Sequence, residues 1–379
     1  MPSPSPTDLP SPSPTDLPSP TGLPSATPSP TGLPSATPLP TGLPSATPSP
    51  TGLSSATPFP TATAPGGDGG EGGPGENTPD EVPTSSVWGD PHVKSWDGLI
   101  ATYVSCGDSV LAKTADNSFM FQARTCLRGN DAASTCAVAF RCSKDADLVE
   151  VYATRNGIRT FISGGQLAKT EHKFVHSGKG TEISSQPGQF TITCVSGPEL
   201  EVFERENSDG SIYLDTRASL PLSFKGKVSG LAGTFNDRRN DDIISRDGTV
   251  WNADHGLDYV SAIEHPSLQQ IQDSWTPLGE EKLFHLSAEE SEAKCTASNQ
   301  HRKVLSSIKS TAEEECKAMG FSGPWFVTCV FDYTRSSGDP KTVINHKQAH
   351  ADFTTSSKPK RALLSIQKSA PMADSSATL

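Results

Sequence analysis

Short runs of alternating apolar and polar residues, separated by turn residues, dominate the chain from Ser86 to about residue 285. A period of two residues is typical of strands that bury one face. Leu148–Thr154 and Ile158–Ile162 flank an Asn156-Gly157 pair, and Asn-Gly favours the tight turn of a β-hairpin. The other predicted strands are Leu99–Ser105, Ser109–Lys113, Phe119–Arg124, Ala137–Arg141, Phe190–Val195, and the hairpin partners Leu200–Arg205 and Ser211–Thr216.

Helical periodicity appears only after Ser287, around His301–Met319. Many short strands with no long helical pattern between them favour an antiparallel β-sandwich. We therefore predict a mostly β fold, an antiparallel β-sandwich followed by a small α-helical appendage that contains cysteines. The predicted domains are 1–84, 85–285, 286–345 and 346–379.

The first of these domains is a repetitive arm rich in proline, serine and threonine. The sequence PSPSPTDL occurs twice and is followed by copies of SPTGLPSATP. Such a segment lacks the apolar side chains needed to offset chain entropy, so we expect a disordered, extended arm. Its composition is that of O-glycosylated, mucin-like stalks, although a bare linker without sugar has the same composition. The polar tail from residue 346 is also expected to be disordered.

Charge and hydropathy exclude two classes of partner. The net charge is −12, from 31 Lys and Arg against 43 Asp and Glu, and no basic stripe suits a nucleic acid. No run of about 18 apolar residues exists, so no transmembrane span is predicted.

Eight cysteines, an even number without a CxxC pair, indicate disulfides rather than a zinc site. Four disulfides require an oxidising compartment, so we expect a secreted, extracellular protein. The opening MPSPSPTDLP has neither the basic start nor the apolar core of a signal peptide, and our expectation is a truncated gene model.

Two segments at opposite ends of the predicted β region carry the most specific pattern. The first is WGDPH at Trp88–His92 with WDG at Trp96–Gly98; the second is GLAGTFN at Gly230–Asn236 with NDDI at Asn240–Ile243. In this order they resemble the opening GDPH and DG and the closing GLCGNF and DD signatures of the von Willebrand factor type D domain. This domain occurs in gel-forming mucins and other extracellular proteins.

The second segment has the chemistry of a calcium loop, because it concentrates carboxylate and amide oxygens on a turning backbone. The resemblance implies the ligands Asp97, Asn236, the Arg238 carbonyl, Asp241 and Asp242. Thr234 replaces a family asparagine, and its hydroxyl is a weaker ligand. The alternative is that Asp241 and Asp242 only cap a turn or face solvent. A calcium ion here would join the first strands to the last loop in a structural role.

The resemblance also implies a set of cysteine pairings. These are Cys106–Cys295, Cys126–Cys136, Cys142–Cys194 and Cys316–Cys329, with the third expected to join neighbouring strands. The family's CGLC pair is replaced by Ser229 and Ala232, and its early cysteine is absent near Ser85. We therefore expect no covalent multimer through that site. Around Cys329 the appendage is similar to a C8-like region with fewer cysteines.

Asp90-Pro91 is the one reactive feature of the sequence. In some mucins a similar GDPH segment cleaves itself, the aspartate carboxyl attacking its own carbonyl carbon while the proline nitrogen leaves, with His92 available to transfer a proton. The alternative is that the segment is an ordinary strand entry. A hydrolase triad could be drawn from His92, His172, His176, Asp108 and Ser109, but no catalytic motif supports it. We predict no enzyme.

The function predicted from these features is an extracellular structural or adhesive module, stabilised by calcium, that binds matrix or cell-surface proteins. The alternative is a binding module for a soluble ligand, either a lipid or a signalling protein. Exposed apolar surface at Phe119–Phe121 would favour the alternative, whereas a polar surface there would favour adhesion.

Overall fold

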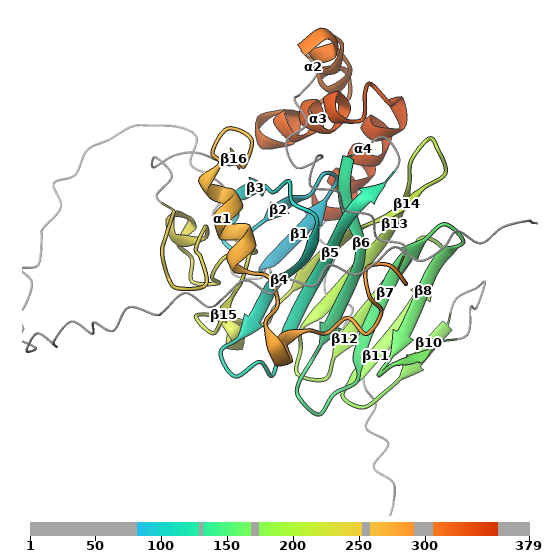
Figure 1. The fold of residues 1–379 in the computed structure, drawn as a ribbon, viewed down its shortest axis with the longest axis vertical. Coiled ribbons are helices and arrows are strands. Elements are labelled where there is room, and N and C mark those ends of the chain that lie inside the picture. Colours follow the sequence, from blue (N-terminus) through green and yellow to red (C-terminus); the bar gives the residue numbers. More distant parts are fainter. Residues whose placement is uncertain (1–81, 129–131, 168–173, 252–257, 292–305, 355–379) are drawn as a thin grey trace, which may run out of the picture. The chain divides into compact units, whose positions relative to one another are not determined.

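The computed structural model describes residues 82–128, 132–167, 174–251, 258–291 and 306–354, all within one compact unit. Two twisted sheets lie face to face, and three helices gather at one end of the strands (Figure 1). The mostly β fold is therefore confirmed. Among the described residues, no helix is long and apolar enough to cross a membrane.

The nine-stranded sheet, sheet A, has the order β10-β11-β12-β13-β14-β1-β2-β3-β16. Its strands are β1 (Thr84–Trp88), β2 (His92–Lys94), β3 (Ile100–Thr102), β10 (Phe174–Ser177), β11 (Thr181–Gln186), β12 (Gln189–Cys194), β13 (Glu199–Glu206), β14 (Ile212–Ser219) and β16 (Tyr259–Ser261). Neighbours are antiparallel except β3 and β16, which pair in parallel. The first strand thus lies inside the sheet, between β14 and β2.

The seven-stranded sheet, sheet B, has the order β15-β4-β5-β6-β7-β8-β9. Its strands are β4 (Gly107–Thr114), β5 (Met120–Arg128), β6 (Ala132–Arg141), β7 (Leu148–Thr154), β8 (Gly157–Ile162), β9 (Gly165–Gln166) and β15 (Val228–Ser229). The hairpin predicted around Asn156-Gly157 is present, with Thr154 opposite Gly157.

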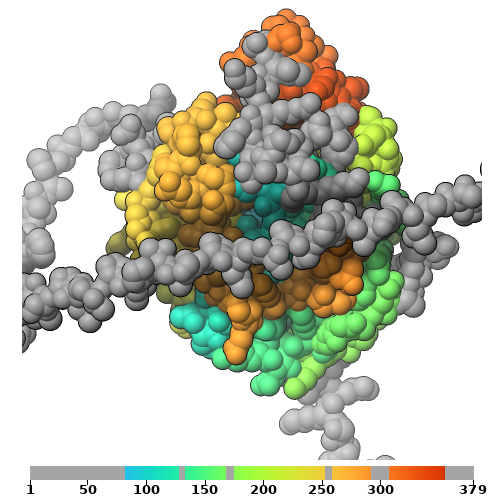
Figure 2. Space-filling model, in the orientation of Figure 1, coloured from blue at the N-terminus to red at the C-terminus, as the bar shows by residue number. Residues whose placement is uncertain are grey.

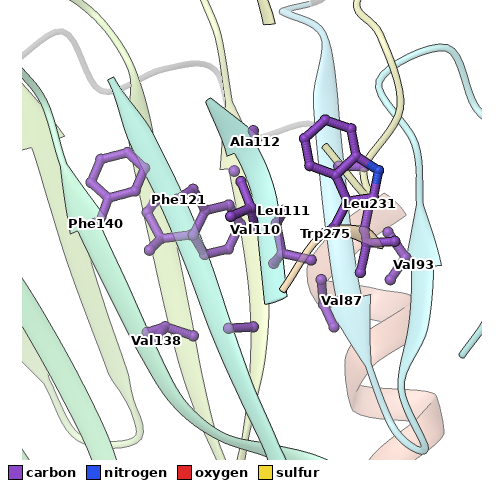
Figure 3. Close-up of a cluster of buried hydrophobic side chains, with 14 of the residues drawn as sticks. Val87, Val93, Val110, Leu111, Ala112, Phe121, Val138, Phe140, Leu231 and Trp275 are labelled. Carbon is purple, nitrogen blue, oxygen red and sulfur yellow. The ribbon is translucent and has the colours of Figure 1, made fainter. Parts of the chain in front are cut away.

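Inward-facing side chains of both sheets form one hydrophobic core. Val87 and Val93 from sheet A pack with Val110, Phe121 and others from sheet B (Figure 3). Phe119, Met120 and Phe121 are at most 1% exposed. The apolar surface that would have favoured a soluble ligand is therefore not present at this hairpin.

A strap of residues 278–291 crosses the outer face of sheet B (Figure 2). Leu283 packs on Met120 and Ala139, while Phe284 contacts Tyr152. The strap begins with the 3-10 helix η3 (Gly279–Glu281). Because the strap covers this face, the central strands of sheet B bury both of their faces.

The C-terminal helices pack on one end of sheet A, against β1, β3, β13 and β14. These helices are α2 (Lys309–Ala318), α3 (Gly323–Arg335) and α4 (Pro340–Thr354), preceded by the 3-10 helix η5 (Ser306–Ile308). We call residues 306–354 the helical unit. The remaining short helices are α1 (Ser267–Ser274), η1 (Leu222–Phe224) and η2 (Arg239–Asp241).

The described residues contain three disulfides, and each matches a pairing implied by the family resemblance. Cys126–Cys136 joins adjacent strands of sheet B, and Cys316–Cys329 joins α2 to α3. Cys142–Cys194 joins the two sheets, whereas we had expected it to join neighbouring strands. The fourth predicted pairing, Cys106–Cys295, lies partly outside the described residues because Cys295 is not among them.

Two sequence expectations are corrected by the structure. Helix α1 precedes Ser287, where no helix was predicted, because its sequence SLQQIQDS offers only two large apolar residues to a periodicity search. The ordered part also extends beyond residue 345, since α4 continues to Thr354 with Ala349 buried against Trp88 and Ile100. The predicted disorder of residues 1–81 and 355–379 lies outside the described residues.

Candidate metal site and the Gly89–His92 turn

Asp97 lies directly beside the loop that the sequence singled out at the other end of the β region. Its Oδ2 accepts hydrogen bonds from the backbone N–H groups of Asn236 at 3.1 Å and Arg238 at 2.9 Å. Two segments separated by about 140 residues of chain therefore meet at one carboxylate. Gly98, with φ +94°, makes the turn that presents Asp97.

The loop folds back on itself through its own polar side chains. Asn236 Nδ2 donates to Asp241 Oδ2 at 2.9 Å, and the Thr234 hydroxyl donates to Asp241 Oδ1 at 3.3 Å. Helix η2 supplies the tight turn that brings Asp241 back toward Asn236. Thr234 thus positions the carboxylate of Asp241 through a hydrogen bond. This role does not require its hydroxyl to be a strong calcium ligand.

Asp242 is the buried member of this group. It is 2% exposed; Oδ2 accepts from the Ser95 hydroxyl at 2.5 Å, while Oδ1 has no hydrogen-bond partner. Burial, together with the nearby carboxylates of Asp97 and Asp241, raises the pKa of Asp242 to about 8, although the hydrogen bond from Ser95 lowers it. An unpartnered buried carboxylate oxygen beside two more carboxylates is a site that a cation would stabilise.

Gly233 allows this close approach. Its φ is +79°, and an added Cβ would lie 2.4 Å from Asp242 Oδ1. Ser95 and Gly233 were not identified as functional residues from the sequence. Ser95 and Asp242 are 147 positions apart, and a single sequence does not indicate which residues so far apart are in contact.

The oxygens assembled here suit a hard cation such as calcium, which binds carboxylate, amide, hydroxyl and carbonyl oxygens. All six predicted residues are in one place: Asp97, Thr234, Asn236, Arg238, Asp241 and Asp242. Across the described ranges, no three His, Cys, Asp or Glu side chains are placed together so that they could hold a metal ion. Amide, hydroxyl and main-chain oxygens would therefore have to complete the coordination.

The Gly89–His92 turn at the other end of β2 is buried beneath the helical unit. Asp90 is 3% exposed and forms an ion pair with Arg335 of α3. Burial raises the pKa of Asp90 to about 6, although the Arg335 guanidinium lowers it. Gly89 has φ +58°, and an added Cβ would lie 2.3 Å from a carboxylate oxygen of Asp332.

His92 is held at both ring nitrogens. Nδ1 is 2.6 Å from the Thr102 hydroxyl and Nε2 is 2.7 Å from Asp332 Oδ1. Asp108, the acid of the hypothetical triad, instead binds Arg124 through both carboxylate oxygens. The triad is therefore not assembled among its described members, and His172 lies outside them. Self-cleavage at Asp90-Pro91 stays a prediction.

Comparison with known proteins identifies the β region. Residues 85–249 match the family model of the von Willebrand factor type D domain. Sushi domain-containing protein 2 of Homo sapiens is 30% identical over 174 residues, which cover 44% of this chain and 20% of that protein. Mucin-4 of Homo sapiens is 25% identical over 192 residues, covering 44% of this chain and 3% of that protein. The chain thus spans a small part of either relative, and the match to the family model ends at residue 249, before the helical unit.

Proposed function

We propose that this chain, which carries a von Willebrand factor type D domain at residues 85–249, is an extracellular structural or adhesive module whose rigidity depends on calcium. The observation that carries the proposal is that Asp97 binds the backbone of the Asn236–Asp242 loop, whose Asp242 Oδ1 is buried without a hydrogen-bond partner. Calcium bound there would join the turn after β2 to the loop after β15. Disulfides and calcium are both suited to an oxidising, ion-rich exterior.

In this proposal the protein's residues do the following. Asp97, Asp241 and Asp242 supply negative charge, and Asn236 with the Arg238 carbonyl completes the oxygen set. Ser95 orients Asp242 through its hydroxyl. The bound ion would supply structural cross-linking, and no chemical step is required of it.

The buried Phe119–Phe121 hairpin removes the observation that would have favoured the soluble-ligand alternative. Phe119 and Phe121 lie in the core between the sheets and Met120 lies beneath the strap, which leaves no apolar surface at this point for a lipid. The C8-like character of the helical unit and the glycosylated state of the arm remain parts of the proposal. The proposed partners are matrix or cell-surface proteins.

Adhesion can be measured with the full chain immobilised on beads, offered to matrix-coated surfaces and to intact cells. We expect capture in millimolar calcium, reduced about tenfold by a chelator, because the binding surface is rigid only when the ion is bound. The double variant Asp97→Asn, Asp241→Asn is expected to behave like the chelated protein. Asp247→Asn, in an exposed turn close to the site in sequence, is the matched control and should bind like the parent.

Two outcomes would contradict the proposal. Capture that is indifferent to the chelator and to the double variant would remove calcium from the mechanism. Absence of capture on every surface, by protein shown to be folded, would remove the adhesive role.

A further inference from the structure

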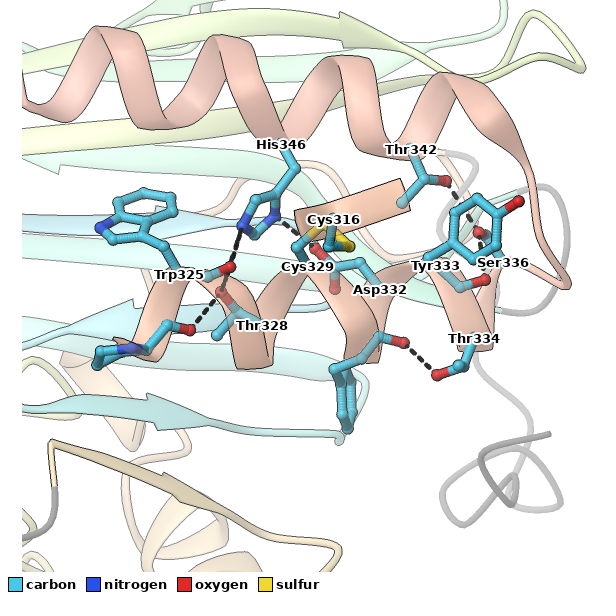
Figure 4. The surroundings of a disulfide bond; sticks show 12 residues. Cys316, Trp325, Thr328, Cys329, Asp332, Tyr333, Thr334, Ser336, Thr342 and His346 are labelled. Atoms are coloured by element: carbon cyan, nitrogen blue, oxygen red, sulfur yellow. Dashed lines mark hydrogen bonds and ion pairs between the residues drawn. A yellow bond between two sulfur atoms is a disulfide. The ribbon is translucent and has the colours of Figure 1, made fainter. Parts of the chain in front are cut away.

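The hollow beneath the helical unit is a poor candidate for a ligand site, because its ionisable side chains bind one another. Its volume is about 50 Å³, and Asp332 and His346 are among the residues that line it. His346 Nδ1 is 3.3 Å from Asp332 Oδ2, and Nε2 is 3.1 Å from the Trp325 carbonyl oxygen (Figure 4). This hollow therefore belongs to the packing of the helical unit on sheet A.

A larger hollow, of about 710 Å³, lies between helix α1 and the chain that follows the candidate metal site. Residues 244–251 of that chain form a short hairpin, closed by a β-bridge between Ile244 and Val250 (Figure 1). We call it the 244–251 hairpin. Sites for small molecules have volumes of about 300 to 1,000 Å³. The hollow therefore has the size of a ligand site.

The 244–251 hairpin supplies an apolar wall with an aromatic ring. Val250 is 39% exposed and Trp251 is partly exposed, and both line the hollow. Trp251 Nε1 donates to the Ser267 hydroxyl at 2.9 Å, and the His265 ring packs against the indole with ring centroids 5.1 Å apart. The indole is thus held in one orientation before any ligand binds, which lowers the entropy cost of binding.

Helix α1 supplies a polar wall. Ser267, Gln270 and Ser274 line the hollow, and their spacing of three and four residues places them on one face of the helix. The Gln270 side chain is exposed and makes no hydrogen bond to another described residue. Its amide is therefore available both to donate and to accept hydrogen bonds.

The charged residues that line the hollow already have partners. Arg246 Nε donates to the Ser274 carbonyl at 2.7 Å, and its Nη1 binds the Glu281 carboxylate at 2.8 Å. The Asp247 carboxylate accepts a hydrogen bond from the backbone N–H of Thr249 at 2.9 Å, within the hairpin turn. The hydrogen-bonding groups left to a ligand are therefore uncharged, which favours a neutral ligand over an ionic one.

We propose that this hollow binds a neutral sugar of a matrix or cell-surface glycan. A pyranose ring has an apolar face of C–H groups, which suits the Trp251 ring, and a rim of hydroxyls, which suits the Gln270 amide and the Ser267 hydroxyl. A peptide strand fits less well, because the backbone groups of α1 bind within the helix and offer no edge to extend. The inference rests on the adhesive role proposed above and names a ligand class for it.

Binding of the full chain to beads that carry terminal galactose, N-acetylgalactosamine, N-acetylglucosamine or mannose tests the proposal. We expect retention on at least one of these neutral sugars. Gln270→Ala is expected to weaken it about three- to tenfold, because a hydrogen bond is lost at an exposed position that folding does not need. Trp251→Ala should weaken it at least about tenfold. The matched control, Gln186→Ala, makes the same change on β11, outside the hollow, and should bind like the parent.

Three results would overturn the proposal. They are no retention of folded protein on any of the neutral sugars, equal retention of the parent and Gln270→Ala, and equal retention on beads that carry the unglycosylated repeat peptide SPTGLPSATP. The beads carry isolated sugars, so this test is separate from capture on matrix and cells. A chain that binds a sugar but captures neither surface would contradict the adhesive role and leave the sugar site in place.

Discussion

Replacing Cys142 and Cys194 together by serine is expected to lower the free energy of unfolding by roughly 4 kcal/mol. The two cysteines are 52 residues apart and join sheet A to sheet B, so their bond restricts the unfolded chain strongly. Urea unfolding followed by tryptophan fluorescence would measure the loss.

The matched control is the pair Cys126→Ser, Cys136→Ser. These cysteines are 10 residues apart on adjacent strands, so the same chemistry closes a much shorter loop. Removing this disulfide is expected to lower the free energy of unfolding by about 2.7 kcal/mol. A larger loss from the short loop than from the long one would contradict the account of how the sheets are held together.

Asp242→Asn is expected to stabilise the metal-free protein and to abolish its stabilisation by calcium. The pKa of Asp242 is about 8 in the folded protein, whereas in the unfolded chain it has its ordinary value near 3.8. At a pH between these two values, the Asp242 carboxyl is therefore protonated in the folded protein and ionised in the unfolded chain. Stability of the metal-free parent should therefore fall as pH rises from about 4 to 8, by on the order of a few kcal/mol. The asparagine carries no charge, so the variant should lack this slope.

Thermal unfolding in a chelator at several pH values would test whether the stability of the metal-free protein falls as pH rises. The control is Asp237→Asn, in the same loop but 61% exposed and paired only with a lysine, which should change stability by less than about 0.5 kcal/mol. A parent whose metal-free stability rises over the same pH interval would show that Asp242 is not a strained buried carboxylate.

The sequence predicted the central strands well, since their patterns are strongly apolar. Leu148–Thr154 was predicted with the bounds that β7 has in the structure. Strand β11, TEISSQ, was missed because only Thr181 and Ile183 are buried and the rest of its residues are polar. Strand β1 was missed because its polar serines are buried between two strands and beneath the helical unit, where pattern alone predicts exposure.

The candidate metal site was predicted from a family resemblance, and its supporting residues were not. Asp97 and the Asn236–Asp242 loop carry recognisable signatures, whereas Ser95 is unremarkable until the fold places it beside Asp242. In the same way, nothing near Asp90 or His92 in sequence points to Arg335 and Asp332, which are more than 200 positions away. Contacts of this kind depend on how whole elements pack.

The most direct test of the central claim is a calcium titration of the full chain, followed by thermal unfolding at each concentration. If calcium binds the folded form, a calcium concentration about a hundredfold above its dissociation constant should raise the free energy of unfolding by about 2.7 kcal/mol. The melting temperature should then rise by roughly 5 to 10 °C, and a chelator should reverse the rise. A melting temperature that stays constant from chelator to millimolar calcium would contradict the claim that Asp97 and the Asn236–Asp242 loop hold one cation.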